Sequence, residues 1–61
     1  MTGKEVIDIL KKQGWELLRI SGSHCRLGKK GLRTTVPVHG KHDLGKGLIC
    51  AIERQTGVKL K

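Results

Sequence analysis

The chain has 61 residues, and its thirteen Lys and Arg against five Asp and Glu give a formal net charge of +8 with the histidines neutral. Hydrophobic residues make up 36% of the chain, and Trp15 is the only residue of the Phe, Trp and Tyr group. This length predicts a single domain, residues 1–61, with a thin aliphatic core. No apolar run approaches the ~20 residues that span a membrane, so we expect a soluble protein with no membrane partner.

The N-terminal segment has the pattern of an amphipathic helix. Thr2-Gly3-Lys4-Glu5 has the S/T-x-x-E form of a capping box. The apolar side chains that follow on one helical face are Val6, Ile7 and Leu10. Gly14 suits the left-handed residue that commonly follows a helix, so we predict a helix from about Gly3 to Gln13.

Three short strands separated by two turns are predicted next. Trp15–Ser21 is rich in branched and aromatic residues, which favours a strand. Gly22-Ser23 marks a turn, and His24–Leu27 is the second strand. Residues 28–31 form the second turn, before a third strand over Leu32–Val38. Two tight connections in succession predict an antiparallel meander.

The remaining residues predict a polar loop and a second helix. Residues 39–47 form the loop, and the helix runs from about Lys46 to Thr56, with Gly57 at its end. The order is α-β-β-β-α, an α+β fold with a three-stranded antiparallel sheet. Both helices should cover the same face of the sheet, because neither layer can bury its apolar surface alone. The other face would remain open to solvent. Pro37 lacks an amide hydrogen, so it is expected at the end of the third strand or at a sheet edge.

The excess of positive charge indicates a polyanionic partner. Neutralisation of phosphates by Lys and Arg favours nucleic acid, with binding that weakens steeply as salt is added. Small proteins can also be basic without binding nucleic acid, and an acidic protein partner is compatible with the same charge.

His24 is the candidate catalytic residue, because it follows a tight turn and stands between arginines at the start of a strand. RNA can be cleaved without a metal when a base takes the proton of a ribose 2′-OH and an acid protonates the leaving 5′ oxygen. His39 is the candidate for that acid or for a phosphate contact. The cations that we expect to contact RNA are Arg19, Arg26, Lys29, Lys30 and Lys41. Composition alone favours the simpler interpretation that His24 is a surface residue of a turn with no functional role.

A metal site and a catalytic cysteine are both disfavoured. His39 and His42 are three residues apart, but neither C-x-x-C nor H-E-x-x-H spacing is present. We therefore predict no metal and no cofactor. Cys25 and Cys50 are expected to be reduced thiols of a cytoplasmic protein, both buried as small apolar groups.

Several motifs together resemble a known family in their order and spacing. They are Gly14-Trp15, Arg19, the Gly22-Ser23-His24 triplet, Val36-Pro37-Val38-His39 and the Lys46-Gly47 step into the last helix. In these the chain resembles the HicA toxins of bacterial and archaeal type II toxin–antitoxin systems. The resemblance implies a fold like the double-stranded RNA-binding domain and an activity as an mRNA interferase, a ribosome-independent endoribonuclease. It also implies that His24 is the catalytic histidine and that an antitoxin of the HicB type covers it.

The chain departs from the family pattern at two places and leaves two other functions open. In the strand after the Gly-Ser-His motif, family members often have an aromatic residue or a second histidine, where this chain has Cys25-Arg26-Leu27. Their last helix often opens with Gly-Thr-Leu, where this chain has Gly47-Leu48-Ile49. The scarcity of aromatics disfavours sequence recognition by base stacking. The main alternative is a non-catalytic RNA-binding module of the same fold, and another is a basic protein that only binds an acidic partner.

Overall fold

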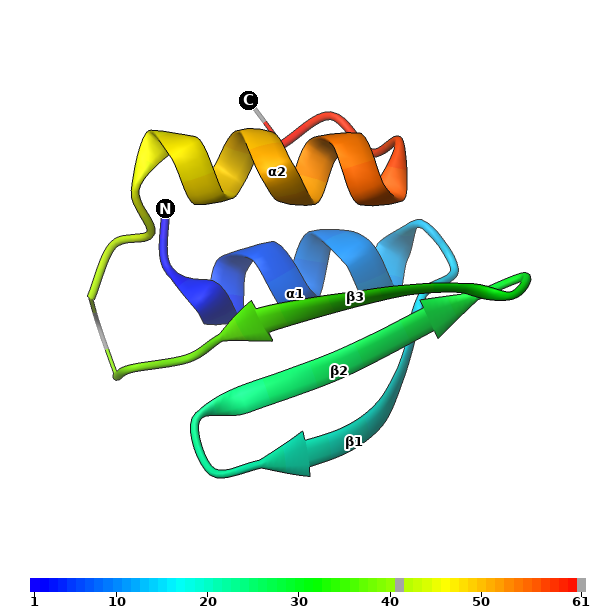
Figure 1. Ribbon diagram of the computed structural model, residues 1–61, viewed down its shortest axis with the longest axis horizontal. Helices are drawn as coiled ribbons and strands as arrows, with labels where there is room; N and C mark the ends of the chain where they lie inside the picture. Colours follow the sequence, from blue (N-terminus) through cyan, green and yellow to red (C-terminus); the bar gives the residue numbers. More distant parts are fainter. Residues whose placement is uncertain (41, 61) are drawn as a thin grey trace.

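The computed structural model describes residues 1–40 and 42–60. Its elements, in chain order, are α1 (Gly3–Lys12), β1 (Glu16–Ser21), β2 (His24–Lys29), β3 (Leu32–Pro37) and α2 (Lys46–Thr56). Figure 1 shows the strands side by side, with β1 at the edge farthest from α2. They form one antiparallel sheet in the order β1-β2-β3, so the predicted α-β-β-β-α order and the meander are confirmed. Across the described residues, no helix is both long enough and apolar enough to cross a membrane.

The predicted capping box begins α1. The Thr2 hydroxyl accepts a hydrogen bond from the Glu5 amide (3.3 Å), and the Glu5 carboxylate accepts one from the Thr2 amide (2.9 Å). These bonds satisfy two amides at the helix N-terminus. The helix ends at Lys12, and Gly14 follows with φ +94°, the left-handed backbone predicted for it.

The second hairpin is tighter than the sequence indicated. β2 continues to Lys29, which pairs with Leu32, so the turn contains only Lys30 and Gly31. Both have positive φ, 49° and 85°, as type I′ turns require. The prediction of a four-residue turn over residues 28–31 was therefore wrong. Gly28 is a strand residue, and a Cβ there would lie 2.6 Å from Cδ1 of Leu18, so its small size serves packing across the sheet.

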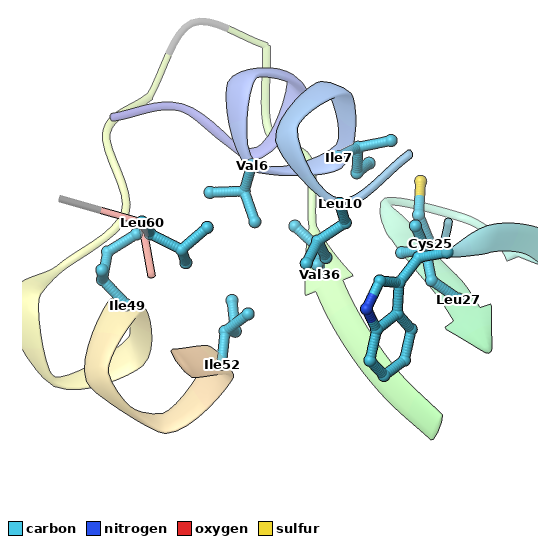
Figure 2. Close-up of a cluster of buried hydrophobic side chains, with 10 residues drawn as sticks. Val6, Ile7, Leu10, Cys25, Leu27, Val36, Ile49, Ile52 and Leu60 are labelled. Carbon is cyan, nitrogen blue, oxygen red and sulfur yellow. The ribbon is translucent and has the colours of Figure 1, made fainter. Parts of the chain in front are cut away.

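Both helices and one face of the sheet share a single hydrophobic core, as predicted. Figure 2 shows side chains from α1, α2 and the sheet in this cluster. The largest fully buried side chains are Leu10, Leu27, Ile52, Val6 and Val36. Gly57 turns the chain after α2 with φ +72°, and the tail then returns so that Leu60 is only 4% exposed. The Leu60 amide donates to Glu53 Oε2 at 2.8 Å, which anchors this tail.

One of the two cysteines differs from its prediction. Cys25 is buried in the sheet, as expected, but Cys50 is exposed on α2. In a helix each residue is rotated about 100° from the one before it. Ile49 and Ile52 define the face of α2 that points into the core, and position 50 falls on the opposite side. The prediction that Cys50 is buried was therefore wrong.

We predict that Leu27→Ala destabilises the protein by about 2–5 kcal/mol, because it leaves a cavity at a position with no solvent exposure. Leu32→Ala removes the same atoms from a side chain that is 53% exposed, and it should change stability by less than about 0.5 kcal/mol. Urea unfolding monitored by circular dichroism measures both. Equal losses in the two variants would contradict the described core.

The capping box should also make stability depend on pH. The Thr2 amide, which donates to the carboxylate, lowers the pKa of Glu5 below its ordinary value of 4.5. A carboxylate with a lowered folded-state pKa stabilises the fold above its unfolded-state pKa, and that stabilisation is lost as the pH falls through the folded-state pKa. Part of the decrease in unfolding free energy below about pH 4.5 should therefore be absent in Glu5→Gln. Parallel stability–pH curves for the two proteins would contradict this role of Glu5.

Candidate functional site

The open face of the sheet is polar because side chains alternate along each strand. In β2, Cys25 and Leu27 are buried beneath the helices, whereas His24 and Arg26 are exposed on the other face. His24 is the first residue of β2 and follows the turn at Gly22-Ser23, where Gly22 has φ +59°. The short turn therefore places the imidazole at one end of the open face, as the sequence predicted.

Strand pairing adds further polar side chains around His24. Arg19 of β1 and Thr35 of β3 are both paired with Arg26, one on each side of it. Ser21 of β1 is paired with His24 in the neighbouring row. These five residues line one open hollow of ≈ 440 Å³. Two arginines, two hydroxyls and an imidazole are suited to hold a phosphate group.

A backbone hydrogen bond brings the second histidine to this site. Pro37 ends β3 opposite His24, and the next amide, that of Val38, donates to the Ser23 carbonyl at 2.6 Å. His39 follows directly, and its ring centroid lies 6.4 Å from that of His24, with the ring planes at 82°. Both rings are exposed. At this separation and angle the rings are neighbours without being stacked, so a single ligand can contact both.

Two residues of the loop after His39, Asp43 and Leu44, contact the N-terminal residue. The His42 amide donates to the His39 carbonyl at 3.2 Å, and the Leu44 amide donates to the Met1 carbonyl at 2.7 Å. The Met1 amino group also forms an ion pair with Asp43 at 3.3 Å. Met1, two residues before α1, therefore anchors Asp43 and Leu44 in the loop that follows His39.

The charge of the site favours an anion. Arg19 and Arg26 lie directly opposite each other on adjacent strands, an arrangement that destabilises a sheet when both residues carry the same charge. Within residues 1–40 and 42–60 the one ion pair is that of Met1 with Asp43, so no described carboxylate neutralises either arginine. A bound phosphate would relieve their repulsion.

Two other predicted cations, Lys29 and Lys30, lie away from this site. Lys29 points to the helix side of the sheet, where its Nζ donates to the Gln13 carbonyl at the end of α1. Lys30 lies in the turn beyond the opposite end of β2, which at about 3.4 Å per residue is roughly 17 Å long from His24 to Lys29. Lys41 lies outside the described residues. The structure thus brings together His24, His39, Arg19 and Arg26, whereas Lys29 and Lys30 lie away from them.

Two residues of the site, Ser21 and Thr35, were not among the sequence-based candidates. Ser21 could have been predicted from the sequence, because the residues on either side of a tight turn are paired and Ser21 and His24 flank the Gly22-Ser23 turn. Paired residues have their side chains on the same face of the sheet. Thr35 is paired with Arg26 only because the second hairpin has a two-residue turn. Among the described residues, no three His, Cys, Asp or Glu side chains form a group that could hold a metal ion.

Comparison with known proteins agrees with the motifs. The family model for the HicA toxin of bacterial toxin–antitoxin systems matches residues 3–58. The "Probable mRNA interferase HicA" of Pseudomonas fluorescens (strain Pf0-1) is 40% identical over 50 residues, which cover 82% of this chain and 83% of the relative. No solved structure matches significantly. The resemblance read from the motifs is confirmed, and the chain belongs to the HicA family of toxins.

Proposed function

We propose that this protein is an endoribonuclease toxin that cleaves mRNA, with His24 as the general base. Membership of the HicA family and a relative named as an mRNA interferase support the activity. One observation supports the assignment of catalytic roles to individual residues. The rings of His24 and His39 have centroids 6.4 Å apart, and they lie beside a hollow lined by two arginines.

The proposed reaction needs two proton transfers and no cofactor. Neutral His24 takes the proton of a ribose 2′-OH while the 2′ oxygen attacks the adjacent phosphorus. As the bond from phosphorus to the 5′ oxygen breaks, protonated His39 gives a proton to that oxygen. The products are a 2′,3′-cyclic phosphate and a 5′-hydroxyl. Each positioned proton transfer contributes roughly 10²- to 10⁴-fold to the rate.

The arginines have a separate role in this mechanism. Arg19 and Arg26 donate charge-assisted hydrogen bonds to the phosphoryl oxygens and stabilise the charge that increases as the 2′ oxygen attacks. Ser21 and Thr35 offer hydroxyls to the same group or to the ribose. The chain has no Phe or Tyr and its Trp15 is buried in the core, so we expect the protein to select bases loosely. It would accept a flexible single strand whose phosphodiester can reach the open face.

The same open face is where an antitoxin would act. An antitoxin of the HicB type that covers the row formed by His24 and the two arginines would exclude RNA from the site. The net charge of +8 is complementary to an acidic antitoxin, because carboxylates could take the place of phosphates beside the arginines.

We predict that His24→Ala lowers the rate of RNA cleavage by about 10²- to 10⁴-fold while RNA binding is retained, because both arginines remain. His42→Ala is the matched control, since it removes another exposed histidine from the neighbouring loop. Cleavage of a labelled RNA and binding by filter retention measure the two effects. Cleavage by His24→Ala at the wild-type rate would refute the base, and binding of RNA without cleavage by the wild-type protein would favour the RNA-binding module.

The acid role of His39 can be separated from that of His24. On ordinary RNA, His39→Ala should be slower by about 10²- to 10⁴-fold. A nucleoside 3′-phosphate ester of p-nitrophenol has a leaving group that needs no proton, so His39→Ala should cleave it nearly as fast as the wild type. His24→Ala should remain slow on this substrate, because the 2′-OH must still lose its proton. If His39→Ala is equally impaired on both substrates, His39 is not the acid.

A further inference from the structure

Strand β1 is an edge strand with an unusual number of exposed apolar side chains. All six of its residues are exposed. Leu17 is 37% exposed, Leu18 is 47% exposed and Ile20 is 61% exposed. In Figure 1 the outer side of β1 is at the free edge of the sheet, away from both α2 and β3. Such an edge presents backbone N–H and C=O groups that can pair with another strand.

A bulge limits which part of this edge can pair regularly. The register between β1 and β2 shifts between Leu17 and Arg19, so Leu18 is the extra residue. Its side chain lies over Gly28 on the open face. A bulge disrupts regular pairing where it occurs. The regular part of the edge is therefore Arg19–Ser21, which is also the part that borders the hollow beside His24.

The two sides of this segment differ in chemistry. Arg19 and Ser21 face the open side, where both line the hollow. Ile20 is paired with the buried Cys25, so it faces the helix side and is nevertheless 61% exposed. A strand laid along the edge would alternate in the same way, because neighbouring strands share the pleat. Its side chain beside Arg19 would be on the open face, and the side chain beside Ile20 would be on the helix side.

We propose that the Arg19–Ser21 edge is the docking surface for an extended segment of an acidic protein, which adds to the sheet as a fourth strand. This inference rests on the proposed function, since it assigns where a neutralising partner meets the catalytic face. An acidic residue of the segment pairs with Arg19 and an apolar residue covers Ile20 and Leu17. The segment's carboxylate then occupies the side of the hollow where a phosphate would bind, so the partner and RNA exclude each other.

Charge favours an acidic protein over the other occupants. A second copy of this chain would bring two charges of +8 together and place its own arginines near Arg19. RNA can neutralise the arginines, but it cannot pair with the backbone of a strand or cover Ile20. An acidic, partly apolar strand satisfies the arginine, the apolar side chains and the free backbone groups together.

The test uses a blocked eight-residue peptide of alternating Glu and Val as the probe, titrated into the ¹⁵N-labelled full chain. We expect the amide resonances of Arg19–Ser21 to shift more than those elsewhere. Ile20→Lys should weaken binding about tenfold or more, because it removes the apolar contact of the paired segment. Leu32→Lys is the matched control, since it makes the same change at a side chain that is 53% exposed on β3, and its binding should equal that of the wild type.

Two modified probes test the mode of binding. A peptide with Glu and Val in separate blocks has the same charge without the alternation, and an alternating peptide with N-methylated amides on one edge cannot complete the ladder. Both should bind less tightly than the first peptide. Equal binding by all three peptides, or unchanged binding by Ile20→Lys, would show general electrostatic attraction and overturn the proposal.

The remaining outcomes are also decisive. The proposal is wrong if about 1 mM peptide causes no shift at residues 19–21, since a complex with a Kd near 1 mM would then be half formed. It is also wrong if only an RNA oligonucleotide shifts the amide resonances of this edge. Self-association of the free chain through this edge, detected as a dimer mass in light scattering that Ile20→Lys abolishes, would overturn it as well. The experiment has no catalytic step, so peptide binding at Arg19–Ser21 supports the docking surface even if His24→Ala still cleaves RNA. Failure to bind overturns it even where cleavage requires His24.

Discussion

A three-stranded sheet has two faces, and a chain of 61 residues with 36% hydrophobic content can cover only one of them. Both helices bury their apolar faces on the same side, where Leu27 and Val36 are fully enclosed. Because side chains alternate along a strand, this packing turns Arg26 and Thr35 to the opposite face. The open polar surface is therefore a direct consequence of how the core is formed.

The site uses this surface together with two short connections. The Gly22-Ser23 turn puts His24 at the end of β2, and the bond from the Val38 amide to the Ser23 carbonyl brings His39 beside it. The open face suits the proposed reaction, because a phosphodiester on a flexible strand could reach both histidines without a deep cleft. Arg19 and Arg26 face each other on adjacent strands, and no carboxylate among the described residues forms an ion pair with either of them. The repulsion between the two charges destabilises the sheet, and a bound anion would reduce it.

The prediction from sequence succeeded where a pattern is local. The capping box, the periodicity of the helices and the glycines at 14 and 57 each act within a few residues, and all are as predicted. It failed where a position depends on a distant neighbour. Gly28 has the composition of a turn but packs under Leu18. The charge of Lys29 likewise does not reveal that its Nζ donates to the Gln13 carbonyl at the end of α1, and its contact with RNA stays a prediction. The Cys50 prediction failed for a local reason: it followed the apolar character of the residue, whereas the helical rotation from Ile49 and Ile52 places position 50 on the solvent side of α2.

The sequence by itself determined the order of the elements, the family, and His24 as the residue to examine first, because all of these are carried by spacing along the chain. Only the tertiary structure decided which cations accompany that histidine. Arg19 and Arg26 are paired across β1 and β2, and the register of the second hairpin pairs Thr35 with Arg26. Lys29 faces the helix side of the sheet instead. The physical reason is that strand register and facing are set by pairing between residues far apart in the chain, and a change of two residues in a turn changes which side chains are neighbours.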